Sequence, residues 1–208
     1  MADTDADSEP YRTVAEVGRT AFEIKGSEFT GHVAPVRTRA AAEAYIQEVR
    51  EEFDGATIIP AYRVRVDSGS GYLLREYQSD SHEPTGSAGK PALNVLVQRE
   101  LENVVAVVAR YYGGTNLGIG GLARAYGRGV KDAVEDAGIT TRRPAETFEL
   151  EVVYDDSGTV RGILESAGVE FEADYAETVA FEVTAPVAEA EELKDRIRSA
   201  TSGRADIS

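Results

Sequence analysis

The chain has 208 residues, which is long enough for one large domain or two small ones with a buried core. It carries 37 acidic and 22 basic residues, a formal net charge of −15, and no cysteine, which excludes both a disulfide framework and a thiolate metal site. No apolar run is long enough to span a membrane, and the N-terminus lacks the charged-then-apolar pattern of a secretion signal, so we expect a cytoplasmic protein with no membrane partner.

The acidic composition comes with a scarcity of lysine, since the lysines are Lys25, Lys90, Lys131 and Lys194. A surface rich in Asp and Glu and poor in Lys suits a cell interior with molar salt, where screening weakens the repulsion between like charges. We interpret the composition as a halophilic adaptation. An ordinary acidic mesophilic protein is the alternative, and it leaves the lysine scarcity unexplained.

The charge is spread unevenly along the chain. Residues 1–144 hold 17 basic and 21 acidic residues, whereas residues 145–208 hold 5 and 16. The change falls near the polar segment Thr140–Pro144, whose proline is incompatible with a helix interior. We therefore predict a disordered acidic tail and two domains, over residues 1–9, 10–143 and 144–208.

Short apolar patterns open the first domain. Residues 11–17 and 21–24 flank Gly18-Arg19-Thr20 and predict a β-hairpin, and residues 29–36 predict another strand. Thr38 is placed to cap a helix that Gly55 ends. The apolar face of that helix has a clear period of 3.6 residues and consists of Ala42, Tyr45, Ile46, Val49 and Phe53.

The centre of the chain is a buried strand followed by a glycine-rich loop and a helix. Before it, residues 58–66 and 72–77 are strand-like around a turn over residues 67–71, and Pro91 is placed to begin a short helix. Val104–Ala109 is a continuous apolar run, typical of a strand buried on both faces. The helix after the loop has one apolar face, formed by Leu122, Tyr126, Val130, Ala133, Val134 and Ala137. These elements predict a two-layer α/β sandwich with a mixed sheet.

The second domain has a regular order of elements. Alternating apolar residues predict strands over residues 148–154, 169–175 and 179–183, and residues 205–207 supply a last strand. Asp156 or Ser157 is placed to cap the first helix, and a second helix follows Pro186. The order βαββαβ predicts a ferredoxin-like domain, so the fold class of the whole chain is α+β.

Three motifs resemble the signature of the IMPACT family, in particular its bacterial and archaeal YigZ-like members. They lie over Glu83–Pro91, Asn103–Gly114 and Leu117–Tyr126. The sequence departs from the family pattern at Ser81-His82, Ser87 and Tyr112, and the segment over residues 57–61 lacks the polar His and Cys residues common there.

The resemblance implies a first domain with the fold of a ribosomal protein domain and of small-molecule kinases that bind phosphate on a glycine loop. It implies a second domain similar to a late domain of elongation factor G. It also implies a link to translation and to stress responses, because eukaryotic relatives restrain a starvation-activated initiation-factor kinase. That partner chemistry uses a segment that this chain does not match.

The glycine run Gly113–Gly121 lets the backbone approach a ligand closely, and a helix N-terminus next to it favours an anion. We favour a phosphate site, in a nucleic acid or a small ligand. A tight turn without a ligand is one alternative. Dinucleotide binding is another, since residues 118–123 fit G-x-G-x-x-G/A, but it needs a second parallel strand after the helix.

Cations gather near the glycine run. Arg124, Arg128 and Lys131 share one helix face, and Arg110 ends the preceding strand. A solvated face neutralised by nearby acids is the alternative. Three aromatic residues are candidates for stacking on bases, namely Tyr111, Tyr112 and Tyr126, of which Tyr126 is equally explained as core.

The segment Asp80-Ser81-His82-Glu83 combines two carboxylates with a histidine. A catalytic site there needs Ser87 or Thr85 beside His82, and a metal site needs further ligands. We favour a structural role in which the segment fixes a turn, and we expect no metal. The residues of this turn motif are Asp80, Glu83, Pro84, Gly86 and Gly89.

The sequence as a whole favours a non-enzymatic, translation-associated regulator that binds RNA or a ribosomal surface and uses no cofactor. The binding residues expected are Arg110, Tyr111, Tyr112, Gly113, Gly114, Gly118, Gly120, Gly121, Arg124, Arg128 and Lys131. One alternative is a small-molecule enzyme that binds phosphate on the same glycine loop. The other is a regulator that binds a protein partner through the acidic C-terminal domain.

Overall fold

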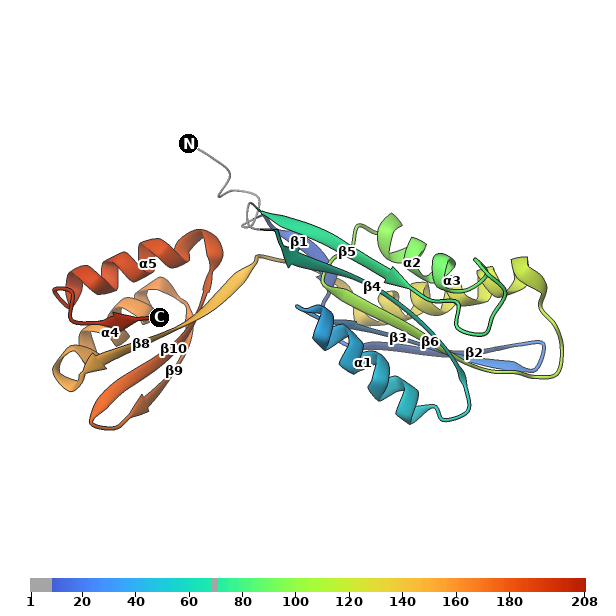
Figure 1. The fold of residues 1–208 in the computed structure, drawn as a ribbon, viewed down its shortest axis with the longest axis horizontal. Coiled ribbons are helices and arrows are strands. Elements are labelled where there is room, and N and C mark those ends of the chain that lie inside the picture. Colours follow the sequence, from blue (N-terminus) through green and yellow to red (C-terminus); the bar gives the residue numbers. More distant parts are fainter. Residues whose placement is uncertain (1–8, 69–70) are drawn as a thin grey trace. The chain divides into compact units, whose positions relative to one another are not determined.

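The computed structural model describes residues 9–68 and 71–208. These form two compact units, an N-terminal one of residues 11–142 and a C-terminal one of residues 143–208, with which residues 9–10 are grouped (Figure 1). The predicted acidic tail lies outside the described residues except for Glu9, and the predicted turn over residues 67–71 is described only in part. Each unit has its own hydrophobic core. Independent folding of the predicted domains stays a prediction.

The N-terminal unit is built on one antiparallel sheet with the strand order β2-β3-β6-β4-β5. The strands are β2 (Gly18–Ile24), β3 (Ser27–Pro35), β4 (Thr57–Asp67), β5 (Tyr72–Gln78) and β6 (Val104–Tyr111). The prediction of a mixed sheet is therefore wrong. In this sheet, strands that are consecutive in the chain, β2 with β3 and β4 with β5, are joined by short connections, which suit antiparallel pairing.

The predicted hairpin around Gly18–Thr20 is also wrong. Strand β1 (Tyr11–Val14) instead pairs with β7 (Ile139–Arg142), far along the chain. The hairpin joins β2 to β3 through Lys25 and Gly26, whose φ angles are 51° and 80°. Positive φ at both central residues is the requirement of the tight turn that matches strand twist, so Lys25-Gly26 is the turn signal.

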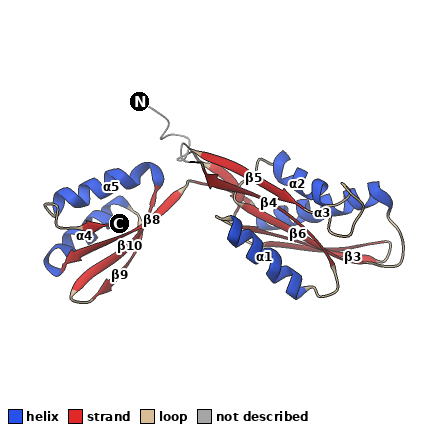
Figure 2. Cartoon of the chain, in the orientation of Figure 1, coloured by secondary structure: helices blue, strands red, loops and turns tan. Residues whose placement is uncertain are grey.

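Helices cover both faces of this sheet, whereas the sequence predicts a sandwich of two layers. On one face α1 (Arg39–Glu52) packs against β4 and β6. Thr38 caps its start, where the Thr38 side chain accepts a hydrogen bond from the Ala41 amide at 3.1 Å. On the other face lie α2 (Gly89–Gln98) and α3 (Gly118–Ala137) (Figure 2). Alternate residues of β6 enter the two cores, which explains why its whole apolar run is buried.

Helix α3 approaches the sheet closely because glycines face it. A Cβ atom at Gly31 of β3 would lie 2.2 Å from the carbonyl oxygen of Gly129, and one at Gly18 would lie 2.1 Å from that of Ala133. The predicted apolar face of α3 is buried as expected. These contacts fix the position of the helix that carries most of the predicted cations.

The C-terminal unit has the predicted order βαββαβ. Its elements are β8 (Ala145–Val153), α4 (Tyr154–Ala167), β9 (Glu170–Tyr175), β10 (Thr178–Pro186), α5 (Val187–Ala200) and β11 (Asp206–Ile207). The sheet order β11-β8-β10-β9, with antiparallel neighbours, is that of a ferredoxin-like domain. The α+β class is confirmed.

Helix α4 begins earlier than the sequence predicts. Tyr154 is its first residue, and Ser157 donates a hydrogen bond to the Tyr154 carbonyl at 2.7 Å instead of capping the helix. Its predicted end at Gly168 is confirmed, with φ of 67°. Across residues 9–68 and 71–208, no helix has the length and apolarity that a membrane crossing requires.

Candidate functional site

Asp80 organises the loop between β5 and α2. Its carboxylate accepts backbone hydrogen bonds from Gly86 at 2.7 Å, Ala88 at 3.0 Å and Gly89 at 2.8 Å. Within the described residues, α2 has no side-chain cap of its own, so Asp80 satisfies amides that the helix leaves free at its start. Burial by itself raises the pKa of the Asp80 carboxyl, but these amides favour its charged form and bring the pKa below its usual value.

Glu83 connects this loop to the sheet and to α3. One carboxylate oxygen, Oε1, accepts from Arg110 Nη1 and from the Tyr126 hydroxyl, both at 2.6 Å. Burial, followed by the hydrogen bond to Glu83, raises the pKa of Tyr126 far above its ordinary value, so the ring stays a neutral donor. Both carboxylates of the Asp80–Glu83 segment are therefore engaged in holding the loop.

Arg110 lies near the end of β6, just before the glycine run, and is not part of an open surface. Its side chain is 7% exposed, and Nη2 donates to Ser27 Oγ at 3.2 Å. Its guanidinium carbon lies 5.3 Å from the centroid of the Tyr112 ring. The sequence predicts Arg110 as a binding residue, but its side chain is not exposed, because its place in β6 directs it to the same face as Val108, under α3.

The glycine run divides into a packing part and an open part. Gly113 lies against the β2–β3 turn, where a Cβ would come within 1.9 Å of Gly26, so glycine is required there. Helix α3 begins at Gly118, so Gly118, Gly120 and Gly121 form its first turn and not a loop. A Cβ at Gly120 would meet no described atom closer than Arg124 Nη1, at 3.5 Å.

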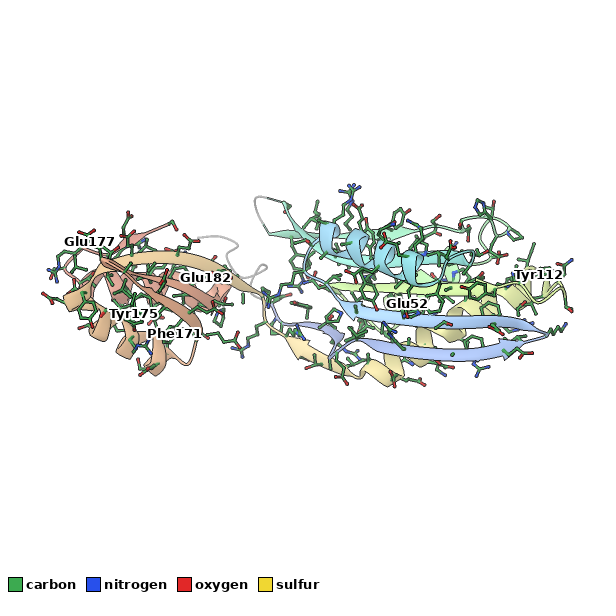
Figure 3. The ribbon with its side chains drawn as sticks, turned by 90° about the horizontal axis from the view of Figure 1, so that it is seen from below. Glu52, Tyr112, Phe171, Tyr175, Glu177 and Glu182 are labelled. Carbon is green, nitrogen blue, oxygen red and sulfur yellow. The ribbon has the colours of Figure 1, made fainter. Side chains whose placement is uncertain are left out.

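The predicted stacking residues lie in different environments. Tyr112 is 59% exposed, donates to Asn116 Oδ1 at 3.2 Å and stands where the loop to α3 begins (Figure 3). Tyr111 is exposed too, but it donates to the Asp54 carbonyl, just beyond the C-terminal end of α1. Tyr126 is completely buried, so it belongs to the core and is not available to a base.

A groove between α2 and α3 brings together the remaining predicted cations. Its volume is about 600 Å³. The lining residues are Val95, Gln98, Arg99, Arg124, Gly127, Arg128, Lys131 and Asp132. We call this the cationic groove. Sequence reasoning missed Arg99, which follows the last residue of α2, because no local pattern brings the end of one helix to the middle of the next.

The ion pairs in the cationic groove leave it with a positive balance. Arg128 donates to Asp132 Oδ2 at 3.0 Å, and Glu135 lies 2.7 Å from Arg99 and 3.9 Å from Lys131. Arg124 has no hydrogen bond or ion pair within the part of the chain that the structure describes. Two carboxylates thus face four cations in a chain whose net charge is −15.

The other chemistries considered for this region find less support. Strand β7 follows α3 but pairs antiparallel with β1, so the described residues provide no second parallel strand for a dinucleotide. Within residues 9–68 and 71–208, no three His, Asp or Glu side chains are grouped to hold a metal ion. The arrangement is suited to binding an anion over an extended surface.

Comparisons with known proteins match both units. Residues 25–134 match the Impact N-terminal domain, and residues 150–204 match a domain of unknown function, DUF1949. The IMPACT family member YvyE of Bacillus subtilis is 32% identical, covering 95% of this chain and 89% of the relative. YigZ of Escherichia coli is 32% identical over 87% and 88%. A crystal structure of a hypothetical protein covers 96% of both chains at 29% identity with a TM-score of 0.67. The chain therefore belongs to the IMPACT family.

Proposed function

We propose that this protein binds RNA, free or on a ribosomal surface, through the cationic groove and acts in translation without catalysing a reaction. The observation that carries the proposal is the convergence of Arg99, Arg124, Arg128 and Lys131 in one groove of a strongly acidic chain. Such a groove attracts a polyanion, and the phosphate backbone of RNA is a polyanion of matching form.

The first turn of α3, which holds the second part of the glycine run, extends the groove toward the start of the helix. Helix α3 has no side-chain cap among the described residues, so its first amides are free to meet an anion. Arg124 lies beside Gly120, which connects this helix start to the cationic groove. We infer that one phosphate contacts the turn at Gly118–Gly121 and that the next phosphates follow Arg124 and Arg128.

Exposed Tyr112 supplies a surface for a base near the same helix start. Base stacking adds roughly 1–3 kcal/mol per base and depends little on sequence. Stacking matters most at a high intracellular salt concentration, because the affinity that comes from phosphate contacts falls as the salt concentration rises.

Membership in the IMPACT family supports a translation-associated regulatory role over a small-molecule enzyme. The position of the cations favours the same choice. Arg124, Arg128 and Lys131 are exposed along a helix, whereas a phosphate-transfer site needs its cations closed around one small ligand. Arg110, three residues before the glycine run in sequence, is already paired with Glu83.

The test is the reversal of two cations that face the groove. Arg124→Glu with Arg128→Glu should weaken binding to a short single-stranded RNA similarly for different sequences, because phosphate contacts carry no sequence information. The slope of log affinity against log salt should fall by roughly 1.4, from about 0.7 for each contact. The matched control is Arg37→Glu with Arg198→Glu, an equal charge change outside the groove. Unchanged affinity and slope in the groove variant would refute the proposal.

A protein partner on the C-terminal unit is a second candidate, and one observation favours it. Helices α4 and α5 pack on one face of the sheet, and the opposite face carries acids with no basic side chain beside them in the described strands. Glu149, Glu182 and Glu172 form a row across β8, β10 and β9, in which Glu182 lies directly opposite each of the other two, beside a hollow of about 290 Å³. Like charges in such positions destabilise a sheet, so a basic partner would relieve the repulsion.

If a basic protein partner binds the acidic sheet face, that binding should not depend on the cations of the cationic groove. A lysine-rich peptide should bind the intact chain, lose affinity with Glu172→Gln plus Glu182→Gln, and keep its affinity with Arg124→Glu plus Arg128→Glu. If the acidic-face variant binds the peptide as well as the unchanged chain does, this second candidate is wrong.

A further inference from the structure

A second hollow lies on the other face of the N-terminal sheet, between α1 and the edge strand β5. Its volume is about 430 Å³. The residues that line it are Arg39, Glu43, Ile46, Arg50, Pro60, Tyr62, Arg75, Glu76 and Tyr77. We call it the Tyr77 hollow. It shares no residue with the cationic groove, so the proposed RNA contact does not explain it.

The hollow exists because α1 covers only part of its sheet face. The helix packs on β6 and β4, and β5 forms the sheet edge beyond them (Figure 1). Side chains of β5 that point to the α1 face are therefore left uncovered. Leu73 is 63% exposed and Tyr77 is 44% exposed.

An ordered aromatic surface forms one wall of the hollow. Tyr77 and Tyr62 are direct cross-strand partners, and their rings stack at a centroid distance of 5.0 Å with 21° between the planes. Tyr62 is buried and holds the ring of Tyr77 in place, while much of Tyr77 remains in solvent. A ring that is fixed and exposed loses little entropy when another flat ring stacks on it.

Cations flank this ring, and not all of them are neutralised. Arg39 is paired with Glu43 at 2.6 Å, and Glu76 is held at 2.8 Å by Arg63, which lies outside the hollow. Arg50 donates to the neutral side chain of Gln47 at 2.9 Å. For Arg75, the described residues provide no ion pair or hydrogen bond. Two cations, Arg50 and Arg75, thus remain without a carboxylate beside an exposed aromatic ring.

We propose that the Tyr77 hollow binds a nucleotide, with its base stacked on Tyr77 and its phosphate between Arg75 and Arg50. A flat aromatic group and a phosphate are what a fixed ring and two uncompensated guanidinium groups recognise together. The volume lies in the range of small-ligand pockets, about 300–1,000 Å³. The same chemistry is offered by a free mononucleotide and by a nucleotide within single-stranded RNA.

The test uses the full chain and adenosine 5′-monophosphate, with adenosine and inorganic phosphate as partial ligands. If the hollow takes a free nucleotide, calorimetry should show binding of the monophosphate, and Tyr77→Ala should weaken it at least about fivefold, the lower end for loss of one stacked base. Tyr77→Phe keeps the ring and should bind as the unchanged chain does. Arg75→Glu should weaken the monophosphate and leave adenosine unaffected, and this variant decides the matter if Tyr77→Ala fails to fold.

A second arm separates the two sources of the nucleotide. A short oligoadenylate is titrated into the Arg124→Glu, Arg128→Glu background, which removes the cationic groove from the measurement. Binding of the oligomer that depends on Tyr77, without binding of the monophosphate, identifies RNA as the source, and the reverse identifies a free nucleotide. If neither ligand binds, or if Tyr77→Ala and Arg75→Glu bind both ligands unchanged, the proposal is overturned. That outcome leaves the cationic groove untouched, because other residues form it.

Discussion

Glu83 and Arg110 form an ion pair with 2.6 Å between Oε1 and Nη1, and their side chains are only 10% and 7% exposed. The pair joins the loop before α2 to the central strand, and Tyr126 donates to the same oxygen from α3. Removing both charges from water is costly, so the pair is weak evidence of net stabilisation. Its effect is to fix the loop, the strand and α3 in one arrangement.

Loss of one partner of this pair should be strongly destabilising. Glu83→Gln leaves the Arg110 charge buried without a carboxylate, and such changes cost about 3–5 kcal/mol. Urea unfolding of the N-terminal unit measures the loss, and Glu83→Gln combined with Arg110→Met should recover part of it. Glu43→Gln, which removes the exposed partner of Arg39, is the control and should have little effect. A Glu83 variant as stable as this control would contradict the prediction.

Asp80 should make stability depend on pH in the acidic range. Its folded-state pKa is lowered, so its contribution is fully present above the unfolded value of about 3.9 and is lost as pH falls through the folded pKa. Urea midpoints of the unchanged chain and of Asp80→Asn should therefore differ at neutral pH and converge in strong acid. A difference that stays constant from neutral pH to the acid limit would show that ionisation of Asp80 is not the cause.

Gly31, which packs tightly against α3, and Gly120, in the first turn of α3, should respond in opposite ways to alanine. Gly31→Ala forces a methyl group to within 2.2 Å of the Gly129 carbonyl oxygen. It should lower the free energy of unfolding by about 1–3 kcal/mol. Gly120→Ala has open space and a helical position, so stability should be unchanged or rise by up to about 1 kcal/mol. If the helix start contacts phosphate, Gly120→Ala should nevertheless weaken RNA binding. Thermal melts and RNA titrations of both variants separate folding from binding.

The sequence predicts what depends on local periodicity. The buried run of β6, the apolar face of α3 and the order βαββαβ all follow from patterns within one element or between consecutive elements. Thr38 is a correct helix cap for the same reason, since its partner is three residues away.

Contacts between distant segments could not be predicted in this way. Strand β1 pairs with β7 across most of the N-terminal unit, and Glu83 meets Arg110 and Tyr126 over 27 and 43 positions. From the sequence, Arg110 is expected to be exposed because it lies near the end of a strand, just before a loop. Side chains alternate between the two faces of a strand, however, and this alternation places Arg110 on the same buried face as Val108. The buried run of β6 already required cover on both faces, so the second helical layer was within reach of sequence reasoning.

The acidic sheet face should make the C-terminal unit sensitive to salt. Glu182→Gln removes the middle charge of the row with Glu149 and Glu172 and should stabilise β10 at low salt. The gain should fade toward about 1 M salt, where the screening length shrinks to about 3 Å. Hydrogen exchange of the β10 amides in the intact chain measures this gain in stability. Glu177→Gln, on the turn between β9 and β10, is the matched control. A gain that is independent of salt would count against charge repulsion and against the halophilic interpretation.

Asp132 should limit the affinity of the cationic groove. It binds Arg128 at 3.0 Å and places a negative charge among the cations that would meet phosphate. Asp132→Asn should therefore strengthen RNA binding and, if Arg128 gains one phosphate contact, steepen the slope of log affinity against log salt by roughly 0.7. The matched control is Asp195→Asn, which frees Arg198 on α5 by the same change. Equal effects of the two substitutions would show that net charge alone is responsible, whereas weaker binding by Asp132→Asn would show that Asp132 positions Arg128 instead of opposing it.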